Sequence, residues 1–304
     1  MQTPQAGARP VVEEVPVKTA GIYVSLVVNR RHKSARIVDF LSGNFGQKAA
    51  AIDAFARREG IERVYTLVER EESLGWARVG FAREGSIPGY YKRSDAHLMG
   101  RVITTPPTLD EDGLPATPPP DANAAEKLLN AAKRLVAEVN EVPRGFKAEA
   151  LNDAEVLASG MLPAKSRRGG AWFDERFGRT GERLHIAGRM TRAGAKLPDQ
   201  VVSVELQEPF GNAFVQLTSW AQKTDDARMI YSSLQSLVEQ LRAKDIGCTF
   251  ALSPADNAIT AAAFLAAGFK RTGLLAQHLC LGDRRVDALL WTRRGASSAD
   301  ADAA

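Results

Sequence analysis

The sequence has little cysteine and no clustered histidine, and each shortage excludes a class of protein. Only two cysteines occur in 304 residues, which excludes a disulfide-stabilised secreted scaffold. Both lie in predicted strands, so we expect Cys248 and Cys280 to pack as small apolar side chains, with no disulfide or metal role. The histidines are scattered without the spacing of metal ligands, and no metal site is predicted. They are His32, His97, His185 and His278.

The sequence also lacks long apolar runs. No run approaches the roughly 18 residues that a membrane-spanning helix requires, and the segment from Met1 to Pro16 has no apolar signal core. We therefore expect a cytoplasmic protein without a membrane partner. A hydrophobic content of 44% and a charged content of 25% are typical of soluble globular proteins, and 304 residues are enough for two domains.

Positive charge is concentrated in one segment. The net charge is only +4, yet nine basic residues and only three acidic ones fall between Lys165 and Lys196. Such a segment attracts anions such as phosphate, a CoA-like molecule or nucleic acid. Because its aromatic residues are not interleaved in a way suited to base stacking, we interpret it as a solvated face and do not expect nucleic acid as the partner.

A short pattern that occurs twice is the most informative feature of the chain. The copies are Gly80-Phe81-Ala82-Arg83-Glu84-Gly85 with Asp95-Ala96, and Gly268-Phe269-Lys270-Arg271-Thr272-Gly273 with Asp287-Ala288. In both, an apolar strand-like run precedes the first glycine and an apolar stretch follows the Asp-Ala pair. Four features in one order predict a strand-helix-strand-strand unit that is used twice. The period is far longer than the roughly 20 to 50 residues of a solenoid repeat.

Prolines divide the chain between these copies. Residues 104–123 hold six of the fifteen prolines, whose fixed φ and missing N–H prevent a helix or a central strand. We predict an extended linker there, between a partial unit at residues 20–103 and a full unit at residues 124–294. A polar arm at residues 1–19 and a tail at residues 295–304 are predicted to be disordered.

Apolar periodicity predicts an α+β fold, with a mixed sheet flanked by helices. In the first unit we predict strands near residues 21–28, 35–40, 62–68, 82–87 and 95–103, and helices near 46–59 and 70–79. The second unit is predicted to begin with an amphipathic helix that ends before Pro143. Its further helices are expected from Asn152, near 226–243 and near 257–267, with strands near 146–151, 182–190, 200–207, 213–220 and 247–252 and two more at the end.

That order of elements, together with one motif, resembles the GNAT N-acetyltransferase fold. The motif looks like the family's Asn-x6-Tyr-x3-Gly-Phe signature around its fourth helix, with phenylalanine in place of tyrosine. The matching residues are Asn257, Phe264, Gly268 and Phe269. In the first unit, the segments Glu84–Tyr91 and Asp95–Met99 are similar to the beta-lysine N-acetyltransferases. That group joins a partial GNAT-like unit at the N-terminus to a complete one at the C-terminus.

The resemblance implies acetyl transfer from acetyl-CoA to a small amine such as a diamino acid. A carboxylate or an ordered water would take a proton from the amine, and backbone amides would polarise the thioester carbonyl. On this basis Glu205 is the candidate base. The candidate cofactor-binding residues are Thr218, Trp220, Arg228, Ser232 and Asn257.

The sequence departs from the family where the cofactor diphosphate should bind. The family uses Arg/Gln-x-x-Gly-x-Gly/Ala at the start of its third helix, and its glycines allow close approach of the backbone to the phosphates. Here Ala227 and Met229 replace the glycines, and Asp225 and Asp226 place negative charge where phosphate would approach. The strand that should supply a base, residues 213–219, has no carboxylate.

These observations leave two functional hypotheses open. One is an acetyl-CoA-dependent N-acetyltransferase whose activity is weakened or lost. The other is a non-catalytic GNAT-derived module that binds a protein partner or regulates one, with the cofactor groove closed or reused. The altered phosphate loop and the long linker favour the second hypothesis.

Overall fold

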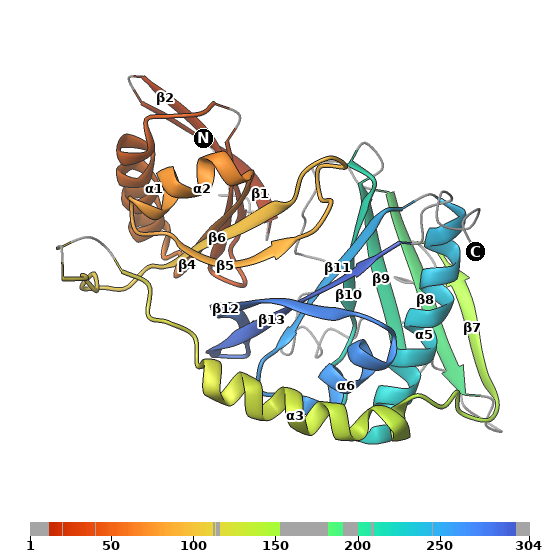
Figure 1. Cartoon of the computed structure of the whole chain (residues 1–304). Helices are drawn as coiled ribbons and strands as arrows, with labels where there is room; N and C mark the ends of the chain where they lie inside the picture. The colour runs from red at the N-terminus through yellow and green to blue at the C-terminus, as the bar shows by residue number, and fades with distance from the viewer. Residues whose placement is uncertain are drawn as a thin grey trace, which may run out of the picture.

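The computed structural model describes residues 12–19, 21–39, 41–111, 113, 116–152, 182–190, 200–207, 210–244 and 246–295. Within them the chain forms a mixed α+β fold with one sheet of thirteen strands and five helices. Figure 1 shows an N-terminal half in red to orange beside a C-terminal half in green to blue. The predicted fold class is confirmed.

The N-terminal half comprises the elements from β1 to β6. They are β1 (Val12–Thr19), β2 (Ile22–Asn29), β3 (Ser34–Val38), α1 (Phe45–Glu59), β4 (Arg63–Val68), α2 (Arg70–Ala77), β5 (Ala82–Ile87) and β6 (Ala96–Val102). Helices α1 and α2 pack over an apolar core that contains Ile52, Phe55 and Trp76.

The C-terminal half comprises the elements from α3 to β13. They are α3 (Ala122–Val139), β7 (Phe146–Leu151), β8 (Glu182–Met190), β9 (Gln200–Gln207), β10 (Asn212–Leu217), α5 (Thr224–Ala243), β11 (Cys248–Pro254), α6 (Ala258–Ala266), β12 (Lys270–Leu281) and β13 (Arg284–Arg294). Helix α3 begins where Asp121 accepts a hydrogen bond from the amide of Ala124 at 2.8 Å. Its apolar face packs against α5 and α6, which it crosses in Figure 1.

The two halves are joined into one sheet. The strand order is β1-β2-β3-β4-β6-β5-β12-β13-β11-β10-β9-β8-β7, so β5 and β12 form the seam. The paired residues at the seam are Gly85 and Gly273, the last glycines of the two sequence repeats. A Cβ on Gly273 would lie 2.8 Å from the Cα of Gly85, so only glycine permits this approach.

From the seam outward, the two halves have equivalent strand orders, β5-β6-β4-β3-β2-β1 on one side and β12-β13-β11-β10-β9-β8 on the other. In each half a parallel pair (β3 with β4, β10 with β11) lies between antiparallel neighbours. The hairpins β5–β6 and β12–β13 both carry a bulge immediately before the repeat glycine, Gly85 or Gly273. The two sequence repeats therefore occupy equivalent positions.

The hairpin contacts extend this equivalence. Asp95 accepts a hydrogen bond from the amide of Gly89 at 2.9 Å, and Asp287 accepts one from the amide of Gln277 at 2.8 Å. Gly89 and Gln277 both have positive φ, 68° and 48°, and each lies four residues after its repeat glycine. The Asp-Ala pair of each repeat thus fixes the bend at which its hairpin leaves the seam.

Some sequence expectations differ from the structure. Part of the arm predicted to be disordered forms strand β1, Val12–Thr19, which pairs antiparallel with β2. Glu13 and Glu14 on it also accept hydrogen bonds from Arg30 and Ser25. The strand predicted at residues 213–220 ends at Leu217. The helix predicted from Asn152 and most of the basic segment lie outside the described residues. The described part of residues 103–121 contains no helix and no extended strand.

Candidate functional site

The parallel strands β10 and β11 separate at their carboxyl ends. Their pairing runs from Asn212 with Cys248 to Val215 with Ala251, and then stops. Beyond that point β10 continues to Leu217 and β11 to Pro254 without pairing with each other, although each stays paired with its other neighbour, β9 or β13. Such a gap between strand ends in an open α/β sheet is a common place for a ligand.

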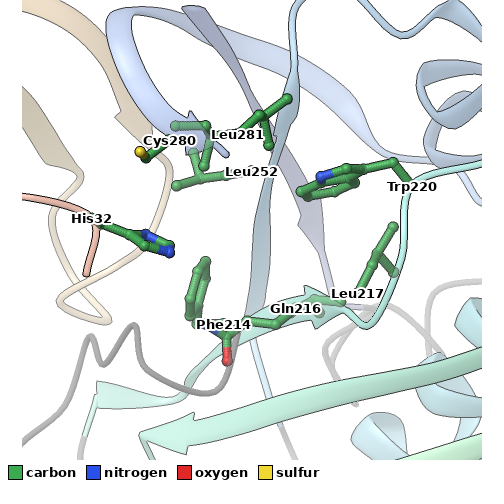
Figure 2. A pocket seen from close by; sticks show the side chains of 10 residues that line it. His32, Phe214, Gln216, Leu217, Trp220, Leu252, Cys280 and Leu281 are labelled. Carbon is green, nitrogen blue, oxygen red and sulfur yellow. The ribbon is translucent and has the colours of Figure 1, made fainter. Parts of the chain in front are cut away.

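A cleft occupies this gap, and both halves of the chain contribute to it. Its cavity volume is about 30 Å³, enough for roughly two water molecules, and it opens to solvent. Its lining consists of His32, Phe214, Val215, Gln216, Leu217, Trp220, Leu252, Leu279, Cys280 and Leu281. Figure 2 shows His32, from the turn between β2 and β3, facing the side chains of the C-terminal half across the open space.

The walls of the cleft are mostly apolar. Its polar side chains are His32, Gln216 and Cys280, and none of its lining residues is aspartate, glutamate, lysine or arginine. The indole Nε1 of Trp220 is buried and has no hydrogen-bond partner among the described residues. An indole N–H can only donate, so this atom is available to an acceptor on a ligand.

The candidate base Glu205 does not line the cleft. It lies on β9 directly opposite Phe214, and its side chain is buried on the same face of the sheet. Its negative charge is one reason that the pKa of Tyr90 is raised to about 12, although burial of the phenol is the larger cause. The structure therefore places Glu205 one strand away from the gap where an acceptor amine would lie.

Two of the candidate cofactor residues lie just after the end of β10. Thr218 accepts a hydrogen bond on Oγ1 from the amide of Val201 at 3.0 Å and donates its own amide to the Val201 carbonyl at 2.9 Å. These bonds close the end of the β9–β10 pair. Trp220 lies in the cleft wall.

Arg228 is held by the helix that precedes the C-terminal sheet. Its Nε donates to the carbonyl of Glu138 at 2.7 Å, and its guanidinium pairs with Glu141 at 3.5 Å and with Asp225 at 3.4 Å. Glu138 belongs to α3 and Glu141 follows it. Arg228 thus ties the end of α3 to the start of α5.

The start of α5 is closed by its own residues. The amides of Asp226 and Ala227 donate to the carbonyl of Lys223, at 3.1 and 3.2 Å. The Asp226 carboxylate accepts from the amides of Gln222 and Lys223, at 2.9 and 3.2 Å. A carboxylate in the first turn of a helix places negative charge at the N-terminus, where it repels a phosphate. The residues present here do not fit a CoA diphosphate.

Ser232 and Asn257 also have internal roles. Ser232 donates from Oγ to the Arg228 carbonyl at 2.8 Å, one turn back along α5. Asn257 caps α6 by accepting from the amide of Thr260 at 2.8 Å, and its Nδ2 donates to the Ala221 carbonyl at 2.9 Å. The motif residue Asn257 therefore ties the loop after β10 to α6.

The corresponding place in the N-terminal half is filled by side chains. Strands β3 and β4 also stop pairing early, after Ile37 with Thr66. There the phenol of Tyr91 donates to the carbonyl of Leu67 at 3.1 Å, and its ring contacts that of Phe210, with centroids 6.0 Å apart. Burial is the largest cause of the raised pKa of Tyr91. Both halves therefore have a gap between their parallel strands, but aromatic side chains fill it only in the N-terminal half.

Sequence reasoning missed the residues that close the cleft from outside β10 and β11. His32 lies about 180 positions before β10, and Leu279 and Leu281 lie on the last hairpin. The repeat gave a signal for their position, because it predicted a second hairpin equivalent to β5–β6. It gave no sign that the two hairpins cross the seam.

The described part of the chain contains no group of three or more histidine, cysteine, aspartate or glutamate side chains arranged to hold a metal. No helix among the described residues is long and apolar enough to cross a membrane.

Comparison with known proteins shows a likeness in structure only. No protein-family model matches the sequence, and no curated protein matches it. About half of the chain is similar in fold to solved N-acetyltransferases. One is the spermidine N-acetyltransferase from Vibrio cholerae in complex with CoA and spermine (10% identity, 51% of this chain, 98% of that chain, TM-score 0.39). Another is the ribosomal-protein-S18-alanine N-acetyltransferase from Escherichia coli (13% identity, 50% and 96%, TM-score 0.37).

Proposed function

We propose that this protein is a GNAT-derived binding module. Its C-terminal half has lost the loop with which the family binds the diphosphate of acetyl-CoA. The observation that carries the proposal is the closed start of α5. Arg228 is bound by Glu138 and Glu141, and the carboxylate of Asp226, in the first turn of α5, accepts from the amides of Gln222 and Lys223. A diphosphate would have to displace a carboxylate and release the end of α3 before it could reach the backbone.

Burial at the same place supports the proposal. Ala227 is fully buried and Met229 is only 5% exposed. The family's loop needs glycines there so that the backbone can approach the phosphates. Ala227 belongs to the apolar core that α3, α5 and α6 share, and the Cε of Met229 lies 3.3 Å from the position of a Cβ on Gly188 of β8. Neither position therefore leaves the backbone of α5 bare in the way that the family's glycines do.

The working site of the proposed module is the cleft between β10 and β11. It is the place where the strands separate, it receives residues from both halves, and it contains an indole donor without a partner among the described residues. Its cavity volume of about 30 Å³ is far below the roughly 300 to 1,000 Å³ of small-molecule pockets, so a ligand would have to move lining side chains.

A melting experiment with acetyl-CoA tests the proposal. A ligand that binds only the folded state at about 100 times its Kd stabilises the protein by about 2.7 kcal/mol, which would raise Tm by several degrees. We expect no shift at millimolar acetyl-CoA, and no release of CoA thiol with diamino acids as acceptors. A reproducible rise in Tm, or thiol release that depends on the amine, would overturn the proposal.

An active N-acetyltransferase is the second candidate, and the separated strand ends favour it. The double variant Met229→Gly with Asp226→Gly separates the two. If only the loop prevents cofactor binding, the variant should gain an acetyl-CoA-dependent rise in Tm. If α3 also blocks the groove, adding Glu141→Gln to release Arg228 should be needed as well. No gain in either variant would mean that the groove itself is lost.

A further inference from the structure

Helix α2 of the N-terminal half and helix α6 of the C-terminal half hold equivalent places. The amide of Phe81 donates to the carbonyl of Trp76 at 3.2 Å, as the amide of Phe269 donates to the carbonyl of Phe264 at 3.0 Å. The aromatic rings of each pair also meet edge-on, with centroids 4.9 and 5.3 Å apart. Trp76 and Phe264 therefore correspond, and so do the residues at equal spacing before and after them.

The outward face of α6 is covered by another helix. The residues of this face have the spacing of one side of a helix and are Ile259, Ala262, Ala263 and Ala266. They form one apolar core with residues of α3 such as Leu129 and Ala132. Ala262 and Ala263 are fully buried there. Figure 1 shows α3 running across α6 in the C-terminal half.

The corresponding face of α2 is exposed. Its residues are Glu71, Leu74, Gly75 and Arg78. Leu74 is 59% exposed, although the corresponding Ala262 is fully buried. Glu71 and Arg78 are exposed too, and neither forms an ion pair with another described residue. Among the described residues no helix packs across α2 as α3 packs across α6.

A hollow lies beside this exposed face. It has a volume of about 460 Å³ and opens to solvent between the start of α1 and the length of α2. Phe45 and Gly46 of α1 line one side, and Leu74, Gly75 and Val79 line the other. At Gly75 the helix has no side chain, because a Cβ there would collide with the ring of Phe45. One surface therefore carries both a protruding leucine and a depression beside it.

The charges on this face are self-complementary. Glu71 and Arg78 lie seven residues apart, with Leu74 and Gly75 midway between them. When two copies of α2 pack antiparallel about this midpoint, Glu71 of each copy faces Arg78 of the other, and Leu74 of each faces Gly75 of the other. A two-fold interface joins the same patch on both chains, so it requires this kind of complementarity. A parallel arrangement would instead place like charges opposite each other.

We propose that the exposed face of α2 is an interface between two copies of this chain. Leu74 of each copy enters the hollow of the other next to Gly75, and two ion pairs between Glu71 and Arg78 fix the antiparallel register. The second copy thus takes the place on α2 that α3 takes on α6. This surface shares no residue with the cleft between β10 and β11, and the inference goes beyond the proposed binding function.

The dimer is expected to be weak, because one short helix forms most of the interface. Transient interfaces bury less than about 1,200 Å², and a Kd on the order of 100 µM is expected. Sedimentation equilibrium of the full chain at about 5 to 500 µM should therefore show both monomer and dimer. A wild-type chain that stays monomeric throughout this range would overturn the proposal and leave the face of α2 to a helix of another protein.

The variant Leu74→Asp tests the apolar centre of the interface. It places a charge in the hollow of the other copy and should weaken the dimer by more than about tenfold. The matched control Leu109→Asp changes a leucine of similar exposure, 55%, and should leave the association unchanged. A Leu74→Asp dimer as stable as the wild-type dimer would mean that another surface forms it, and would overturn the proposal.

Exchange of the charges tests the register. Glu71→Arg and Arg78→Glu alone should each weaken the dimer by about tenfold, because both ion pairs become contacts between like charges. The double variant Glu71→Arg with Arg78→Glu restores both pairs with their signs exchanged, and its Kd should return to within about threefold of the wild-type value. A double variant that associates no better than the single variants would overturn the proposal.

A mixture of the two single variants keeps the test decisive if the double variant does not fold. In an antiparallel pair that contains one copy of each, every substituted residue faces the opposite charge. The equimolar mixture should therefore form a mixed dimer about as stable as the wild-type dimer, although neither variant associates well alone. Absence of a mixed dimer would overturn the proposal.

Discussion

The two halves of this chain follow one topology, yet only one of them is open. In the N-terminal half the gap between the parallel strands is filled by Tyr91 and Phe210. In the C-terminal half the same gap is a cleft, and α3 packs over α5 and α6. The two halves therefore share a topology but differ in what covers it. Side chains fill the gap between the parallel strands in the N-terminal half, whereas in the C-terminal half an extra helix, α3, packs over α5 and α6 and leaves the gap open.

The seam between the halves is also asymmetric. Glu84 lies in the bulge beside Gly85, and its buried carboxylate binds Arg63 of β4 and accepts from the amide of Ala276 in the other half at 3.0 Å. The equivalent residue of the second repeat is Thr272. The contact across the seam therefore joins a carboxylate of the N-terminal half, Glu84, to a backbone amide of the C-terminal half, that of Ala276.

The largest effect is expected from Glu84→Ala. It leaves the fully buried guanidinium of Arg63 without its carboxylate partner and removes the acceptor for Ala276. Breaking a buried ion pair by removal of one partner costs about 3–5 kcal/mol. The measurement is the free energy of unfolding in urea.

The double variant Glu84→Ala with Arg63→Met is the control, because it removes both charges. It should recover part of the loss. If the single and double variants were equally destabilised, the buried charge would not be the cause, and the bulge itself would explain the asymmetry.

A smaller effect is expected from Gly273→Ala. The new Cβ would lie 2.7 Å from the Glu84 carbonyl oxygen and 2.8 Å from the Gly85 Cα, and neither backbone can move away cheaply. Overpacking of this kind costs about 1–3 kcal/mol. Gly46→Ala is the matched control, because nothing lies within 4 Å of its Cβ position. A Tm for Gly273→Ala equal to that of the control would mean that the halves can shift apart at the seam.

The helices and strands could largely be predicted from the sequence, whereas the contacts between segments distant in the chain could not. The repeat was recognisable because turn residues such as Gly85 and Asp95 act locally, and each copy needs them for the same bend. Strand β1 was missed because Glu13 and Glu14 look solvated until Arg30 and Ser25 are placed beside them.

The candidate site shows the same limit. The altered residues at the start of α5 were visible in the sequence, since glycine and acid content is a local property. That Arg228 would be bound by Glu138 was not visible, because the contact joins residues 90 positions apart. The cleft depends on His32 and Leu279, which only the crossing hairpins bring together.

The smallest effect, and the one that separates the two roles of Arg228, is expected from Arg228→Ala. Its guanidinium is partly exposed, so loss of the contacts to Glu138 and Glu141 should cost only about 1 kcal/mol or less. Because these contacts fasten the end of α3, the loss should appear as faster amide hydrogen exchange in α3, while exchange in β4 stays unchanged. Arg271→Ala, which removes the pair with Glu126 near the start of the same helix, is the matched control and should loosen that end instead. Had Arg228 retained a phosphate-binding role, its removal would leave exchange in α3 unaltered and would lower affinity for acetyl-CoA, so the two readouts together decide whether the C-terminal half is closed by its helix.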